Sequence, residues 1–166
     1  MDEKFLRAEE LGIRLEIANG LPIWEASPLY RHQEAVDRIR RTITPLDQAD
    51  FNGNQCECIH AADVYVSFPN GSLKRPDIAI FCRKLTEEEK DDAIKIVPEA
   101  VIEVVSRGYE AKDLEVGPVF YLSQGVKDII IFDPYTLLVM HVKHGGTKRL
   151  VSPVEILLEC GCKCVV

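Results

Sequence analysis

Two acidic residues lie in segments where acidic residues are unusual. Glu103 interrupts the apolar run of VPEAVIEVVS, and Asp77 follows Pro76 at the start of RPDIAIF. Burying an isolated carboxylate costs several kcal/mol unless a cation or a metal ion pairs with it. If the two segments form neighbouring strands, the carboxylates converge on one point, where their hard oxygen atoms suit Mg²⁺ or Mn²⁺. Because such an ion polarises a phosphate and helps to deprotonate water, the pair predicts metal-dependent phosphodiester hydrolysis.

These residues and their neighbours also have ordinary structural explanations. Glu103 can lie at a strand end that reaches water, and Asp77 can be a turn aspartate after a proline. Glu16 alternates with apolar neighbours, which predicts a solvent-facing side chain, with the metal cleft as the alternative. His32 stands near the start of a helical segment, where packing or capping accounts for it without any chemistry.

The hydrophobic pattern predicts the elements that must position these residues. Asn19-Gly20 predicts a hairpin turn between two short strands. Apolar residues at helical spacing predict a long helix that begins at Ser27-Pro28. Helices are predicted for residues 2–11, 27–43 and 111–124, the last starting late because of its proline. Further strands are predicted for CECIHAADVYVSF, RPDIAIF, AVIEVV, KDIIIF, LLVMHV and RLVS.

The composition bounds the class of protein. The chain has 166 residues, of which 46% are hydrophobic and 28% charged, and this balance fits one soluble domain spanning residues 1–166. Its longest apolar run is far shorter than the ~20 residues that a membrane span needs. The charged start MDEKFLRAEELG lacks the apolar region of a signal peptide, so we expect a cytoplasmic protein without membrane contact.

The net charge of −7 argues against a protein that holds nucleic acid by bulk charge alone. The segment RHQEAVDRIRR nevertheless places four arginines close together. A solvated helix face is the simpler explanation for them, and a local basic groove is the alternative.

Six cysteines are present: Cys56, Cys58, Cys82, Cys160, Cys162 and Cys164. Without a secretion signal we expect reduced thiols. The C-x-C and C-x-C-x-C spacings place thiols on one face of a strand, whereas zinc sites more often use C-x₂-C or wider pairs. We therefore predict that the cysteines bind no zinc, with metal binding by the C-terminal tail as the alternative.

Several segments resemble, in chain order, those of a known family. RLEIANGLPIWEASPLYRHQEAV resembles its opening strand, N-G turn and first helix, and RPDIAIF resembles its R-P-D strand. VPEAVIEVVS resembles its P-D-L-V-V-E-V-L-S strand, and KDLEVGPVFYLSQGVKDIIIFDP resembles its D-L-x-x-K-x-x-x-Y-x-x-x-G-V helix and the strand after it. These are segments of the Uma-type restriction endonucleases, within the PD-(D/E)XK nuclease superfamily. Matching positions include His32, Asp113, Tyr121, Gly125, Val126, Asp133 and Pro134.

The resemblance implies an α/β fold of the restriction-endonuclease type, with a central, curved, mixed β-sheet flanked by helices. It implies a Mg²⁺- or Mn²⁺-dependent DNA endonuclease in which Asp77 and Glu103 bind the ion and the carbonyl group of Val104 lies near it. It also implies a homodimer, since two-fold symmetry suits an enzyme that cuts both DNA strands.

The lysine that the superfamily usually needs is absent from both of its expected positions in this chain. It usually lies two residues after the glutamate, where this chain has Val105, or, in this family, on the helix, where this chain has Gly117 followed by Pro118. Lys112 and Arg107 are candidate replacements, and we assign Lys112 as a candidate catalytic residue. Because such a lysine orients water and stabilises developing charge, two hypotheses follow: a nuclease of weak activity, and an inactive nuclease-fold module that binds nucleic acid or protein.

Overall fold

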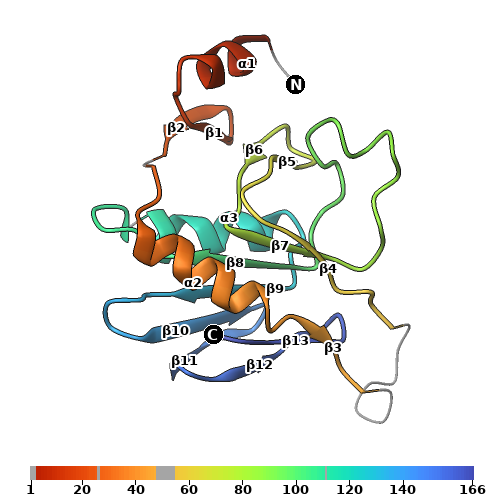
Figure 1. Cartoon of the computed structure of the whole chain (residues 1–166), viewed down its shortest axis with the longest axis vertical. Coiled ribbons are helices and arrows are strands. Elements are labelled where there is room, and N and C mark those ends of the chain that lie inside the picture. Colours follow the sequence, from red (N-terminus) through yellow and green to blue (C-terminus); the bar gives the residue numbers. More distant parts are fainter. Residues whose placement is uncertain (1–2, 26, 48–54, 111) are drawn as a thin grey trace.

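The computed structural model describes residues 3–25, 27–47, 55–110 and 112–166 (Figure 1). Its helices are α1 (Glu3–Glu10), α2 (Tyr30–Arg40), the π-helix Lys112–Val116 and α3 (Gly117–Ser123). Its strands are β1 (Leu15–Ala18), β2 (Leu21–Trp24), β3 (Thr44–Pro45), β4 (Ile59–Ala61), β5 (Val66–Ser67), β6 (Leu73–Lys74), β7 (Ile78–Phe81), β8 (Ala100–Val104), β9 (Asp128–Phe132), β10 (Leu138–Lys143), β11 (Gly146–Val151), β12 (Glu155–Leu157) and β13 (Cys162–Val165). None of the helices in the described residues combines the length and the apolar character that crossing a membrane requires.

The central sheet has six strands in the order β11-β10-β9-β8-β7-β4. β8 and β9 run parallel, and the other neighbouring pairs run antiparallel. A parallel pair needs a long crossover connection, which the π-helix and α3 provide between β8 and β9. The sheet is therefore mixed and flanked by helices, which confirms the predicted α/β fold class.

Side chains alternate between the two faces of this sheet. In β8, Ile102 and Val104 belong to the apolar core that includes the buried residues of α2, whereas Val101 and Val105 belong to the core that includes those of α3. Glu103 lies between Val101 and Val105 in this alternation, so its side chain is on the α3 face. The carboxylate therefore enters a covered face of the sheet.

A second, smaller sheet has the order β2-β1-β6-β5 and lies, with α1, above the central sheet in Figure 1. Asn19 and Gly20 have positive φ angles of 51° and 80°, as a two-residue hairpin turn requires. The predicted hairpin between β1 and β2 is thus confirmed.

Glu16 of β1 does not face solvent, so the prediction of a solvent-facing side chain was wrong. Its side chain is 1% exposed and forms an ion pair with Lys74 of β6, which is 5% exposed. The main-chain N–H of Arg75 also donates a hydrogen bond of 2.7 Å to the Glu16 carboxylate. The pairing of β1 with β6 brings Lys74 beside Glu16, and alternation within β1 alone carries no information about that pairing.

Two boundaries differ from the prediction. The segment CECIHAADVYVSF forms two strands in different sheets, because Asp63 adopts a left-handed φ of 56° between them. Helix α2 begins at Tyr30 with Leu29 as its N-cap, rather than at the Ser-Pro pair.

The tail forms a third sheet of order β12-β13-β3. Two disulfides are present, Cys56–Cys82 and Cys58–Cys162, whereas Cys160 and Cys164 are free and buried. The expectation of reduced thiols is therefore wrong for four of the six cysteines. The spacing within each cysteine cluster cannot predict these disulfides, because the fold brings the tail against the segment before β4. Burial raises the pKa of the Cys164 thiol to about 12, so this group packs as a small apolar side chain.

Candidate active site

The register between β7 and β8 places Asp77 opposite Glu103. Ile78 pairs with Ile102 in this antiparallel pair, and the two acidic residues are one position further out. The main-chain N–H of Asp77 donates a hydrogen bond of 3.1 Å to Oε2 of Glu103, and the N–H of Val104 donates one of 2.8 Å to Oδ2 of Asp77. Since an aspartate carboxylate lies within roughly 5 Å of its own main-chain nitrogen, the two carboxylates lie within ~8 Å of each other.

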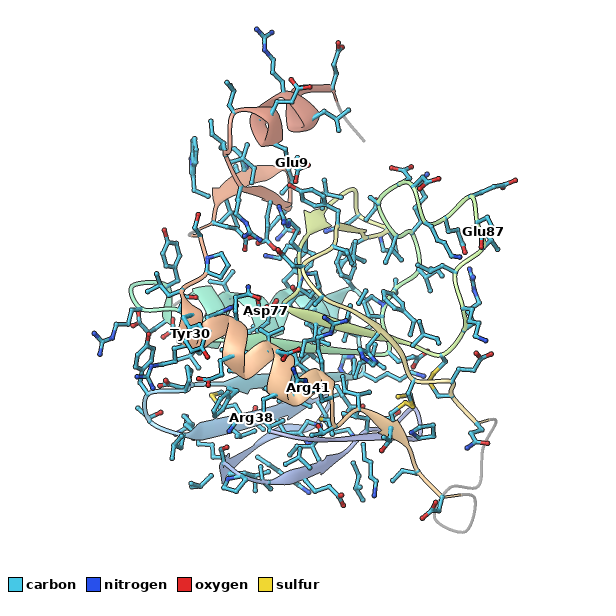
Figure 2. The ribbon with its side chains drawn as sticks, viewed as in Figure 1. Glu9, Tyr30, Arg38, Arg41, Asp77 and Glu87 are labelled. Atoms are coloured by element: carbon cyan, nitrogen blue, oxygen red, sulfur yellow. A yellow bond between two sulfur atoms is a disulfide. The ribbon has the colours of Figure 1, made fainter. Side chains whose placement is uncertain are left out.

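The two carboxylates line a pocket with a volume of about 50 Å³. One water molecule needs ~10–15 Å³ of such space, so the pocket can hold an ion with a few waters. In Figure 2, Asp77 lies next to α2. The lining residues are Arg14, Glu25, Pro28, His32, Gln33, Asp77, Glu103, Val104, Ser106 and Tyr109.

His32, in the first turn of α2, contacts Asp77. Its Nε2 lies 3.0 Å from Oδ2 of Asp77, and its side chain is 11% exposed. An ionised carboxylate only accepts hydrogen bonds, so Nε2 carries the proton in this contact. His32 does not cap the helix, because Leu29 is the N-cap; its side chain contacts the Asp77 carboxylate instead.

Tyr121 of α3 holds the other carboxylate. Its hydroxyl donates a hydrogen bond of 2.5 Å to Oε1 of Glu103. Burial raises the pKa of Tyr121 well above its usual value of 10.0, and the negative charges of Glu103 and Glu16 raise this pKa further. The hydroxyl therefore stays protonated at neutral pH and remains a donor. Tyr121 matches a position of the family resemblance, but no sequence pattern predicts this contact.

Arg14 and Glu25 extend the charged lining of the pocket, and no sequence pattern predicts either of them there. Arg14 precedes β1 and forms an ion pair with Asp63. Glu25 follows β2, and its main-chain N–H donates a hydrogen bond of 3.0 Å to the carbonyl of Arg14. The ends of one hairpin thus bring a cation and a third carboxylate to the pocket. No local spacing in the sequence links them to the R-P-D strand.

The two positions where the family resemblance predicts a lysine lie in different surroundings. Val105 is buried in the core on the α3 face, and Gly117 begins α3, one helical turn before Tyr121. Arg107 is exposed, and its guanidinium carbon lies 4.6 Å from the centre of the Tyr135 ring, outside the pocket lining. Lys112 is the first residue of the π-helix, and its side chain lies outside the described part of the chain, so its catalytic role stays a prediction.

The carboxylate oxygen atoms that line the pocket are suited to bind a hard divalent cation. His32 and Val104 both donate to Oδ2 of Asp77, whereas none of the described residues donates a hydrogen bond to Oδ1 of Asp77. Oδ1 is therefore an oxygen that a cation can take without displacing a protein hydrogen bond. Carboxylate oxygens of this kind are the ligands that Mg²⁺ and Mn²⁺ prefer.

The chain is similar to nucleases in two comparisons. The family model Uma2, described as "Putative restriction endonuclease", matches residues 2–159. The crystal structure of "a putative nuclease belonging to DUF820" from Anabaena variabilis ATCC 29413 has 18% sequence identity and a TM-score of 0.61, covering 86% of this chain and 79% of that chain. No curated protein matches the chain.

The fold and the carboxylate pair define a nuclease-like α/β protein. At this identity the likeness to the Anabaena structure shows the fold alone. The family match covers most of the chain, and the chain belongs to the Uma2 family of putative restriction endonucleases. This membership supports a nuclease function in general terms.

Proposed function

We propose that the chain is a Mg²⁺- or Mn²⁺-dependent DNA endonuclease, with Asp77, Glu103 and the carbonyl oxygen of Val104 as ligands of the ion. The observation that carries this proposal is the meeting of two carboxylates from adjacent central strands in one small pocket. Membership of a family described as restriction endonucleases supports the same reaction class, hydrolysis of a DNA phosphodiester. When bound, the ion supplies a Lewis acid that polarises the phosphate and lowers the pKa of its water.

The protein's own groups orient the two carboxylates. His32 and the main-chain N–H of Val104 hold Oδ2 of Asp77, and Tyr121 holds Oε1 of Glu103. Contacts of this kind fix the direction of a ligand's lone pairs, and their removal typically weakens metal binding about 10–100-fold. The catalytic carboxylates are therefore supported from α2 on one side and from α3 on the other.

Helix α2 is the part of the chain best suited to contact DNA phosphates. Arg31, Arg38 and Arg41 are exposed on or just after the helix that also carries His32. Figure 2 shows Arg38 and Arg41 along this helix, with Asp77 beside it. A local basic surface is needed because the whole chain has a net charge of −7. A second copy of the chain, related by two-fold symmetry, would let the enzyme cut both strands.

The absent lysine favours a second candidate function, a non-catalytic nuclease-fold module that binds nucleic acid or protein. Of the two expected lysine positions, one holds the buried, apolar Val105 and the other holds Gly117, which has no side chain. Losing one electrostatic stabiliser of this kind costs about 10²–10³ in rate. We therefore expect slow cleavage by the unmodified protein, whereas DNA binding without any metal-dependent cleavage would favour the second function.

The experiment that tests the proposed function is nicking of supercoiled plasmid DNA. The unmodified protein is expected to nick slowly with Mg²⁺ or Mn²⁺ and not with a chelator present. Asp77→Asn keeps the shape of the side chain but removes a charged ligand, so it should abolish the nicking. Asp91→Asn, at an exposed position in the segment before β8, is the matched control and should leave the rate unchanged. Equal nicking by Asp77→Asn would show that a contaminant or another site does the cutting.

A further inference from the structure

Five cysteine sulfurs meet at one place in the fold. The Sγ atoms of Cys56, Cys82 and Cys160 lie within 4.8 Å of one another, and so do those of Cys56, Cys58 and Cys162. We call these five residues the sulfur cluster. Cys56 belongs to both groups of three, so it joins them into one cluster. The sixth cysteine, Cys164, belongs to neither group.

The sulfur cluster is separate from the carboxylate pocket. Cys82 directly follows β7, whereas Asp77 directly precedes it. The ends of such a strand are ~16 Å apart at about 3.3 Å per residue. The cluster therefore needs its own explanation, since none of its sulfurs lines the pocket.

The surroundings of the cluster are apolar, and its donor set is all sulfur. Four of its members are buried residues of the core that includes α2, and Cys82 packs against that core. The three-residue groups contain no histidine or carboxylate. Thiolates that converge without oxygen ligands select soft or borderline metals such as zinc, and reject Mg²⁺.

The main chain at Cys58 is shaped so that its N–H points at a neighbouring sulfur atom. Cys58 adopts a left-handed φ of 51°, which is uncommon for any residue but glycine. In this conformation its N–H donates a hydrogen bond of 3.4 Å to Sγ of Cys56. Hydrogen bonds from the main chain to sulfur stabilise the negative charge that a metal-bound thiolate carries.

We propose that the reduced sulfur cluster binds one zinc ion, with Cys56 and three of the other four sulfurs as its ligands. Tetrahedral zinc with Zn–S bonds of about 2.3 Å needs sulfurs ~3.8 Å apart. Cys56 lies within 4.8 Å of each of the other four sulfurs, and once the two disulfides are reduced, side-chain rotations can bring a fourth sulfur to this distance from the others. The ion would tie the C-terminal hairpin to the segment before β4 and to the residue after β7, which the two disulfides also join. This proposal reverses the expectation that the cysteines bind no zinc.

The disulfide form and the zinc form are related by a balanced reaction. Reduction of Cys56–Cys82 and Cys58–Cys162 takes four electrons and four protons, which two molecules of a dithiol supply as each becomes a disulfide. Zinc binding then releases a proton from each thiol that becomes a ligand. Oxidation by an external disulfide reverses the first step and expels the ion, because sulfurs paired in disulfides are no longer thiolates.

Elemental analysis of the whole chain, produced with zinc and purified under a reductant, tests the proposal. We expect about one zinc ion per chain. When Co²⁺ replaces zinc, about one Co²⁺ per chain should bind and give the strong visible absorption of tetrahedral cobalt thiolate. Cys164→Ser should keep the metal. The double variant Cys58→Ser/Cys162→Ser leaves three cluster sulfurs and should lose it.

A second readout does not depend on the folding of a variant. Adding a disulfide oxidant to the reduced, zinc-loaded protein should release the ion to a coloured chelator as two disulfides form per chain. Reduced protein that contains no zinc and gives no cobalt thiolate spectrum would overturn the proposal. Iron in place of zinc, or full retention of zinc by the double variant, would overturn it as well.

Discussion

Gly117→Lys is expected to raise Mg²⁺-dependent nicking of plasmid DNA by about 10²–10³-fold over the unmodified chain. Gly117 lies four residues before Tyr121 in α3, and residues at this spacing share one face of a helix. The Tyr121 hydroxyl reaches Glu103, so a lysine at position 117 would extend along the same face toward the carboxylate pocket. There its ammonium group can stabilise the charge that develops on the phosphate.

Val119→Lys is the matched control for this gain. It adds the same charge to the same helix, but Val119 is 69% exposed and is not at helical spacing from Tyr121. Its nicking rate should equal that of the unmodified protein. An equal rise in both variants would mean that added charge only improves DNA capture. No rise in Gly117→Lys would mean that the helix does not present a lysine to this site.

Lys74→Met should destabilise the protein by about 3–5 kcal/mol, because it leaves Glu16 as a buried charge without its ion-pair partner. Both side chains are almost fully buried, at 5% and 1% exposure. Lys74 also lies over the rings of Phe120 and Tyr121, so its loss should loosen α3. Denaturation with urea measures the change in the free energy of unfolding.

A second substitution separates the charge from the packing. In Lys74→Met/Glu16→Gln the buried charge is gone, while the amide oxygen still accepts the hydrogen bond from Arg75. This double variant should recover more than half of the lost stability. Lys90→Met removes one partner of an exposed pair with Glu87 and should change stability by less than about 1 kcal/mol. If Lys74→Met proves as mild as Lys90→Met, the buried pair is not a stabilising contact.

The central part of the site could be predicted from the sequence because it depends on local pattern. Strand periodicity places Glu103 on a covered face, and Asp77 begins the adjacent strand, so the pairing of two strands suffices to bring them together. His32 and Arg14 reach the pocket through the packing of a helix and a hairpin. No spacing rule encodes such contacts between segments far apart in the chain.

The environments of the cysteines and of Glu16 could not be predicted from local sequence either. Judged by spacing alone, C-x-C and C-x-C-x-C are strand patterns, and the approach of the tail to Cys56 depends on how β13 packs. Glu16 alternates with apolar residues as a solvent-facing residue would. It is buried because β6 lies beside β1 and supplies Lys74. In each case the partner strand, and not the local pattern, decides the environment of the side chain.

Titration of Mn²⁺ followed by electron paramagnetic resonance tests whether Asp77 and Glu103 bind a metal ion, since the signal of free Mn²⁺ disappears on binding. We expect about one bound Mn²⁺ per chain, displaced by excess Mg²⁺, because two carboxylates and a carbonyl suit either ion. Glu103→Gln, which still accepts the Tyr121 hydrogen bond, should weaken this binding at least about ten-fold, and Asp91→Asn should leave it intact. Absence of bound Mn²⁺ up to tens of millimolar in the unmodified protein, or equal binding by Glu103→Gln, would contradict a metal site at Asp77 and Glu103.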